Sequence, residues 1–198
     1  MKIIVIGDVH CKIKKYHEII SSCEKSIQVG DFGFREEWDW LEENVSAEHK
    51  INMGNHDYIP YLNKPHSLGN WSYENGIFTV RGANSVDIHK RTEGIDWFPN
   101  EEINYQETNE VFDNYIEIKP EIMITHDCPS SVAEILFGFP TSGINKEVFK
   151  SHTRELLQGL FEIHQPRIHI FGHHHKSRDM VINGTRFICL AELETFEL

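Results

Sequence analysis

The sequence predicts an α/β fold in which short buried strands alternate with amphipathic helices. Residues 2–6 form a β-branched, almost entirely apolar run, which is typical of a strand buried on both faces. Residues 13–24 place Ile13, Tyr16, Ile20 and Cys23 on one helical stripe and lead to a second apolar run that ends at Asp31. This strand–helix–strand order is the parallel crossover pattern. The 198 residues fit one domain, residues 1–198, with a real core.

The remaining elements follow the same pattern, with one exception. Strands are predicted at residues 49–53, 77–80, 121–125 and 167–171, and helices at residues 35–44, 131–137 and 146–163. Residues 181–188 are expected to form a hairpin around Asn183-Gly184. Between residues 58 and 120 the pattern weakens, so we expect an insertion that lies over the functional site. For its aromatic residues Trp71 and Trp97, burial in the core is the alternative to contact with a substrate.

The composition restricts both the partners and the compartment. A formal net charge of -12 argues against general affinity for nucleic acid backbones, which depends on Lys and Arg. The four cysteines lie far apart, without a C-x-x-C pair, so neither a disulfide framework nor a thiolate zinc site is indicated. No apolar stretch approaches the ~20 residues that span a bilayer. We therefore expect a cytoplasmic protein that binds no membrane and keeps its thiols reduced.

Five predicted strand ends carry side chains of the types that commonly bind metal ions. Each is an apolar run that ends in Gly or Thr and continues into the segments Gly7-Asp8-Val9-His10, Gly30-Asp31, Gly54-Asn55-His56-Asp57, Thr125-His126-Asp127 and Gly172-His173-His174-His175. One Asp-x-His pair alone is ordinary turn chemistry. In an extended segment alternate side chains share a face, so His173 and His175 are expected to act together and His174 to point away. Seven candidate ligands result: Asp8, His10, Asp31, Asn55, His126, His173 and His175.

Seven ligands are too many for one four-coordinate site, but they suit two metal ions that share a bridging aspartate. Two divalent ions, two aspartates and a bridging hydroxide leave a local charge of about +1 when every imidazole is neutral. Such a site fits a phosphate oxygen, even in an acidic protein. The mixture of carboxylate, amide and imidazole ligands suits manganese, iron, zinc or nickel and disfavours calcium. We expect two manganese ions.

These motifs, in this order, resemble the signature of the calcineurin-like metallophosphoesterases. The resemblance runs from Gly7 to His175 and implies a four-layer αββα sandwich with two mixed β-sheets flanked by helices. It also implies that Asp8, His10, Asp31 and His175 hold one metal, and that Asp31, Asn55, His126 and His173 hold the other. His56 would be the general acid that protonates the leaving oxygen.

Two positions depart from the family pattern. Cys11 stands where the family usually has glycine, and Phe34 stands where phosphoprotein phosphatases carry the aspartate that orients the catalytic histidine. Arg35 keeps the adjacent arginine, and Asp57 or another acid could orient His56, so Arg35 and Asp57 join His56 as candidate catalytic residues. Residues 81–87 and 97–101 resemble small single-domain metallophosphoesterases of bacteria and phages.

The resulting hypothesis is a di-metal hydrolase that cleaves a phosphomonoester or phosphodiester by direct attack of a metal-bridging hydroxide. The substrate would be a small phosphoester or a phosphoprotein, and long nucleic acid is the class that the charge favours least. The alternative is a catalytically silent metal-binding scaffold on the same fold that binds a protein partner. A structural zinc protein is a third class, which would unfold when the metal is chelated.

Overall fold

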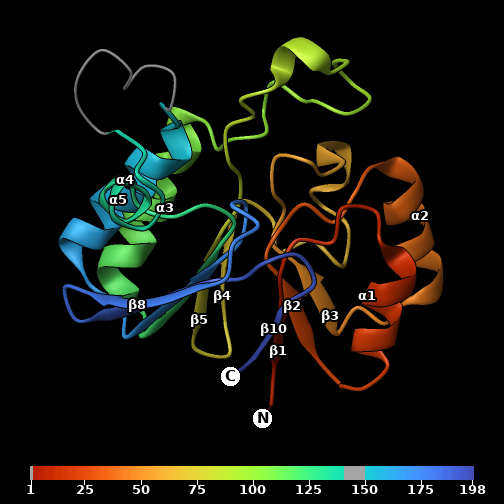
Figure 1. Ribbon diagram of the computed structural model, residues 1–198, viewed down its shortest axis with the longest axis horizontal. Coiled ribbons are helices and arrows are strands. Elements are labelled where there is room, and N and C mark those ends of the chain that lie inside the picture. The colour runs from red at the N-terminus through yellow and green to blue at the C-terminus, as the bar shows by residue number, and fades with distance from the viewer. Residues whose placement is uncertain (1, 141–149) are drawn as a thin grey trace.

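A computed structural model describes residues 2–140 and 150–198 and shows two β-sheets packed face to face between two layers of helices. In Figure 1 the helices α1 (Ile13–Ile20) and α2 (Arg35–Asn44) cover the sheet on the right. The helices α3 (Tyr105–Ile118), α4 (Ser130–Phe137) and α5 (His152–Ile163) cover the sheet on the left. The predicted four-layer αββα arrangement is therefore confirmed.

The smaller sheet contains four strands in the order β10 (Thr195–Glu197), β1 (Ile4–Ile6), β2 (Ser26–Gln28) and β3 (His49–Ile51). The strands β1, β2 and β3 are parallel and β10 is antiparallel, so the sheet is mixed. Side chains alternate across β1. Ile6 packs outward with Tyr16 and Trp38 of the covering helices, while Val5 packs toward the second sheet.

The larger sheet contains six strands, whose order is β4 (Trp71–Glu74), β5 (Ile77–Val80), β6 (Ile122–Thr125), β7 (Ile168–Phe171), β9 (Thr185–Cys189) and β8 (Arg178–Ile182). The four central strands are parallel, and the two edge strands are antiparallel to their neighbours. The edge strand β8 comes from the predicted Asn183-Gly184 hairpin. Both turn residues have positive φ, 49° and 86°, as a two-residue hairpin turn requires.

An aliphatic layer between the sheets holds the sandwich together. Val5 and Val29 from one side meet Ile124, Ile170 and Ile188 from the other, and all five are at most 5% exposed. Separate apolar clusters lie under α3, α4 and α5. The core is therefore built without the candidate ligand side chains, although the strand-end loops contribute Val9, Phe32 and Met53 to it.

The expectation of an insertion across residues 58–120 is wrong for most of that range. The strand β5 pairs with β6 in parallel register, and α3 packs its buried Val111 and Tyr115 on the same sheet, so both belong to the sandwich. Trp71 stacks on Phe78 at 5.7 Å, which places it at the core. The 3-10 helix η1 (Ile59–Tyr61) also contributes Ile59 to the core.

What rises above the sandwich in Figure 1 is a shorter stretch, residues 84–97, which we call the upper loop and which includes the 3-10 helix η2 (Ile88–Lys90).

Two helix predictions need correction, and one helix was not predicted. Helix α3 was not predicted, although Asn104 and Glu107 form a capping box at its start and Asn104 accepts hydrogen bonds from two backbone N–H groups. Helix α1 ends at Ile20, four residues earlier than expected. Helix α5 begins at His152, with Ser151 as its N-cap, and not at residue 146; residues 146–149 lie outside the described residues.

Within the described residues, no helix combines the length and the apolar character needed to cross a lipid bilayer.

Candidate metal centre

Five loops meet at one edge of the sandwich, because they follow the carboxyl ends of parallel strands in the two packed sheets. They come after β1, β2 and β3 in one sheet and after β6 and β7 in the other. The chain turns sharply there. His10, Cys11, Asp31, His173 and His175 all have positive φ, between 45° and 65°, a conformation that side chains adopt at a cost of about 1–3 kcal/mol. The fold therefore holds these five residues in strained loops at one place.

The first group of side chains contains Asp8, His10, Asp31 and His175. One ligand atom from each lies within 4.8 Å of the others. His175 Nε2 is 3.1 Å from Asp8 Oδ2, and His10 Nε2 is 3.7 Å from Asp31 Oδ2. His10 Nε2 and His175 Nε2 are only 2.7 Å apart. Four nitrogen and oxygen donors thus surround one point.

The second group contains Asp31, His126 and His173, again with one ligand atom each within 4.8 Å of the others. His126 Nε2 is 3.2 Å from Asp31 Oδ1 and 3.2 Å from Asn55 Oδ1, so the Asn55 amide oxygen adjoins this group. Asp31 belongs to both groups. All seven residues that the sequence singled out are brought together, and Asp31 lies where the two groups meet.

Two glycines before the ligands are required by close approach. A Cβ atom at Gly54 would lie 2.4 Å from Asp31 Oδ1, and a Cβ atom at Gly172 would lie 2.1 Å from Asp8 Oδ1. Neither distance is compatible with a side chain. The recurrence of glycine in the sequence motifs therefore reflects backbone that runs directly against the aspartates.

The run His173-His174-His175 does not have the extended geometry expected from its sequence. His173 and His175 have φ of 65° and 52°, and the His174 N–H donates to the Gly172 carbonyl at 2.7 Å. His175 reaches the first group and His173 the second. His174 turns away, as expected, and its Nε2 lies 3.1 Å from Asp127 Oδ1, so the curled backbone and not strand alternation separates the three rings.

The electrostatics of the described residues suit cation binding. Burial lowers the pKa of His173 well below its usual value and also lowers that of His10. Burial lowers and Asp31 raises the pKa of His126, with a net rise to about 10, while His126 holds the buried Asp31 carboxyl ionised. In this arrangement His126 carries a proton that faces Asp31. A metal ion bound between the two residues would replace that proton, because imidazole must be neutral to bind a metal.

The donor set fits metal ions on two observations. Asp31 Oδ2 is buried and has no hydrogen-bond partner among the described residues. A buried carboxylate oxygen left in this way costs more than 1–3 kcal/mol, roughly the penalty for a neutral group. The contact between His10 Nε2 and His175 Nε2 joins two nitrogens that would both be ligand atoms. A cation between these groups satisfies the unpaired oxygen and the facing nitrogens together.

Two residues that sequence reasoning missed fix the amide of Asn55. Asn55 Nδ2 donates to Ser85 Oγ at 3.0 Å, and Ser85 Oγ donates to Glu101 Oε2 at 2.7 Å. The Ser85 N–H also donates to Glu101 Oε1. Because the Asn55 nitrogen donates to Ser85, the Asn55 oxygen faces His126. Burial raises the pKa of Glu101, at the end of this chain, to about 7. The sequence offers no local signal, since Ser85 and Glu101 lie 30 and 46 residues from Asn55.

His56 lies beside the two groups without joining them. Its backbone N–H donates to Asp31 Oδ1 at 2.8 Å, and its ring centroid is 5.8 Å from that of His10. Burial, opposed by Asp31 and supported by Arg91, lowers the pKa of His56. Arg91 Nη2 lies 3.2 Å from His56 Nε2, and arginine has only donors, so Nε2 accepts.

The structure places the Asp57 carboxylate away from the His56 ring. It accepts hydrogen bonds from the backbone N–H groups of Asp31, Phe32, Gly33 and Gly54 and from Trp38 Nε1. All five lie at 2.7–3.2 Å, so Asp57 joins the loops after β2 and β3. The interpretation of Asp57 as the acid that orients His56 has no support in these contacts.

Arg35 lies at the first turn of α2 with its side chain 68% exposed, and its Nε is 3.6 Å from Asp39 Oδ2. It lines a pocket of about 460 Å³ together with Cys11, Phe34 and Tyr58. Among the described residues, no hydrogen bond or ion pair joins Arg35 to either ligand group. Cys11 is exposed there as a whole residue, but its thiol is partly removed from water. This partial burial, together with the nearby Glu37, raises the pKa of the thiol to about 11, so it is protonated at neutral pH.

Comparisons with known proteins agree with this site. A family model described as calcineurin-like phosphoesterase matches residues 1–177. A phosphopantetheinyl hydrolase from Mycobacterium tuberculosis has a similar structure, with a TM-score of 0.57 and 15% sequence identity over 96% of this chain and 89% of that chain. GAP50, the anchor in the inner membrane complex of Plasmodium, has a TM-score of 0.55 and 13% identity over 96% of this chain and 71% of that chain. No curated protein matches the sequence significantly.

Proposed function

Since the chain belongs to the calcineurin-like phosphoesterase family, whose members are metal-dependent hydrolases, we propose that it hydrolyses a phosphoester at a centre of two divalent ions. The observation that carries this proposal is Asp31, which is shared by both ligand groups and has one buried oxygen without a partner. One carboxylate placed between two sets of imidazoles suits two ions better than one.

The residues divide between the two ions as follows. Asp8, His10 and His175 would hold the first, Asn55, His126 and His173 would hold the second, and Asp31 would contact both. Two ions held there would polarise a phosphoryl oxygen and make a bound water acidic enough to act as nucleophile near neutral pH. We propose manganese for both ions, with iron, zinc and nickel as alternatives, because the ligands are of intermediate softness.

His56 would supply the proton that the leaving oxygen needs. It is held next to the ligands by the hydrogen bond from its N–H to Asp31, and its side chain is half-buried. To act as the acid it would have to be protonated when the ester is bound, with its Nε2 released from the contact with Arg91. Water would attack phosphorus directly, without a covalent enzyme intermediate. The protonated thiol of Cys11 is a poor nucleophile, which agrees with that route.

Small phosphoesters and phosphoproteins are the substrate classes that we propose. The net charge of -12 disfavours long nucleic acid. The free state of all four cysteines is consistent with a reducing compartment such as the cytoplasm.

Turnover of p-nitrophenyl phosphate and of its bis ester tests the proposal against the silent scaffold. We expect hydrolysis of at least one of them that depends on added manganese, nickel or zinc and stops with a chelator. A panel of alkyl and aryl monoesters and diesters then identifies the class of ester. Metal binding without turnover of any ester in that panel would favour the scaffold.

A further inference from the structure

The upper loop, residues 84–97, brings an arginine to the open side of the centre. Arg91 follows η2, and its side chain is 23% exposed. Arg91 Nε and Nη2 contact Asp87 Oδ2 at 2.9 and 2.7 Å, and Nη2 also reaches His56 Nε2 at 3.2 Å. Among the described residues, Nη1 has no acceptor closer than Asp96 Oδ2 at 4.0 Å. The guanidinium is therefore fixed on one side and has donors to spare on the other.

A guanidinium at this position suits a phosphoryl group. Arginine presents its N–H groups in a planar fork that matches two phosphate oxygens, and it remains charged at any relevant pH. Asp87 offsets part of that charge and holds the fork in place, and the contact with His56 uses one Nη2 donor, so the Nη1 donors stay available for a ligand. Fixing the donor in advance reduces the entropy that binding would cost.

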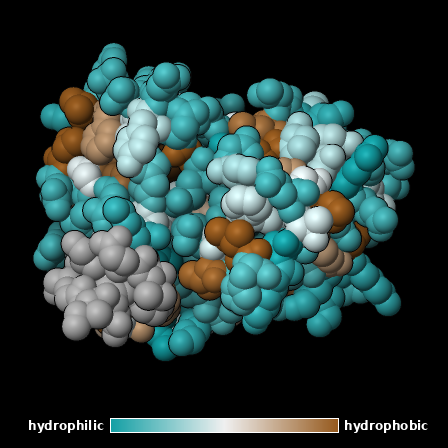
Figure 2. Space-filling model, turned by 90° about the horizontal axis from the view of Figure 1, so that it is seen from above, coloured by the Kyte–Doolittle hydropathy of each residue, from teal (hydrophilic) through white to brown (hydrophobic). Residues whose placement is uncertain are grey.

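A pocket of about 460 Å³ adjoins the same loop. Phe34, Tyr58 and Ile95 of the upper loop give it apolar lining, and Cys11, the neighbour of the candidate ligand His10 in the chain, also lines it. Its charged lining residues are Arg35, Glu36 and Glu37. Ile95 is 64% exposed, and Val86 and Ile88 of the same loop are 69% and 40% exposed. Figure 2, which views the molecule from above, shows a group of apolar atoms near the middle of this face, and further apolar atoms at its upper left and on its right.

We propose that the upper loop recognises the substrate, with Arg91 contacting the phosphoryl group beside His56 and the adjoining pocket taking an apolar or aromatic ester group. This inference rests on the proposed phosphoesterase function and narrows its substrate to esters whose alcohol carries such a group. Arg91 is then a catalytic residue, because it touches the reacting phosphoryl group, and Asp87 is a positioning residue.

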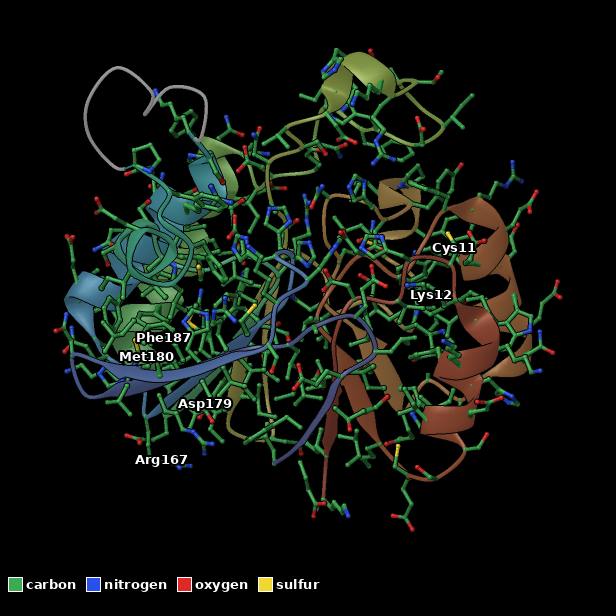
Figure 3. All side chains as sticks on the ribbon, in the orientation of Figure 1. Cys11, Lys12, Arg167, Asp179, Met180 and Phe187 are labelled. Carbon is green, nitrogen blue, oxygen red and sulfur yellow. The ribbon has the colours of Figure 1, made fainter. Side chains whose placement is uncertain are left out.

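The phosphoryl contact is tested with Arg91→Ala and Arg91→Lys. Arg186→Ala is a matched control, because Arg186 contacts the Asp179 carboxylate with the same two donors, Nε and Nη2, at 2.9 and 2.6 Å. Figure 3 shows Asp179 at the opposite end of the sandwich from Cys11. We expect Arg91→Ala to lower kcat/KM about 10- to 100-fold on every ester, Arg91→Lys to recover part of the loss, and Arg186→Ala to change nothing.

Calorimetry with inorganic phosphate separates this inference from the proposed function. Metal-loaded Arg91→Ala should bind phosphate at least about 10-fold more weakly than the unchanged chain, with the same metal content and melting temperature. If no ester is cleaved by the unchanged chain, the proposed function fails while this measurement still decides the role of Arg91. If esters are cleaved and Arg91→Ala binds phosphate as Arg186→Ala does, the inference about Arg91 is wrong.

The pocket is tested by changing the ester group. Ile95→Ser should lower kcat/KM on p-nitrophenyl phosphate more than on methyl phosphate, whereas Arg91→Ala should lower both alike. Val181→Ser, at a side chain 67% exposed on β8, is the control for loss of an exposed apolar residue. Equal effects of Ile95→Ser on both esters would remove the pocket from the recognition site.

Discussion

The orientation of the Asn55 amide depends on two side chains that belong to neither ligand group. Ser85 and Glu101 hold its amide so that the oxygen faces His126, because the amide nitrogen donates to Ser85 and the Ser85 hydroxyl is held by Glu101. Groups that orient a ligand in this way are worth about 10- to 100-fold in metal affinity. The centre therefore extends well beyond the residues of the strand-end motifs.

Replacing Ser85 should weaken only the ion that Asn55 contacts. We predict that Ser85→Ala lowers the affinity for the ion that Asn55 would contact roughly 10- to 100-fold and leaves the affinity for the other ion unchanged, as a stepwise metal titration would measure. Ser72→Ala is the control, because the Ser72 hydroxyl on β4 makes a comparable hydrogen bond with the Thr79 hydroxyl on β5. An unchanged titration of Ser85→Ala would show that the amide needs no such support.

The backbone of Cys11 is strained, at a position where the family usually has glycine. Its φ of 62° lies in the left-handed region, where glycine fits without the steric penalty of a Cβ atom. We predict that Cys11→Gly raises the free energy of unfolding by up to about 1 kcal/mol. The same change at Cys23, which is not in that region, should lower it. Urea unfolding of both variants measures the difference, and a loss of stability in Cys11→Gly would contradict this reading.

The loops after β2 and β3 are joined by one carboxylate. Asp57 accepts five hydrogen bonds, four of them from backbone N–H groups that include that of Asp31. These hydrogen bonds hold the backbone of Asp31, the residue shared by both ligand groups, so the metal centre depends on them.

We predict that Asp57→Asn lowers the free energy of unfolding by at least about 2 kcal/mol, because an amide has one acceptor oxygen and leaves several buried N–H groups unpaired. Metal content should fall with it. Urea unfolding with metal removed from both proteins isolates the effect on the fold. If Asp57→Asn kept its stability and its metals but lost rate only, Asp57 would be acting in catalysis and not in the loop.

The sequence was most informative where a physical constraint is local. The glycine or threonine that begins each strand-end motif, the apolar run before it, and the Asn183-Gly184 turn all act within a few residues, and each predicted feature has its counterpart in the structure. Contacts that join distant segments, such as Arg91 with His56 or Ser85 with Asn55, leave no such mark. The helix α3 was missed for a different reason: its capping residues Asn104 and Glu107 are a local signal in the sequence, but they were not used to predict a helix.

At the scale of the whole molecule, the metal centre lies outside the core. The aliphatic layer between the sheets and the clusters under the helices do not use the ligand side chains. A structural zinc protein, in contrast, has no sufficient core without its metal.

We predict that excess chelator leaves the chain folded. A ligand present at 100 times its Kd stabilises by about 2.7 kcal/mol, which lowers the melting temperature by roughly 5–10 °C when the ion is removed from a chain of this size. Circular dichroism melts with and without chelator measure this shift. Unfolding at room temperature on chelation would support the structural metal.

The central claim is that Asp31 joins two ions and that His56 binds neither, so the most direct test is metal content measured together with rate in Asp31→Asn and His56→Gln. The account predicts two ions per chain in the unchanged protein and the loss of metal and activity together in Asp31→Asn. His56→Gln should keep both ions and lose roughly 10²–10⁴-fold in rate on an alkyl phosphoester, with a smaller loss on p-nitrophenyl phosphate, whose leaving group hardly needs a proton. An Asp31→Asn variant with full metal content, or a His56→Gln variant that loses an ion or cleaves the alkyl ester at the unchanged rate, would contradict it.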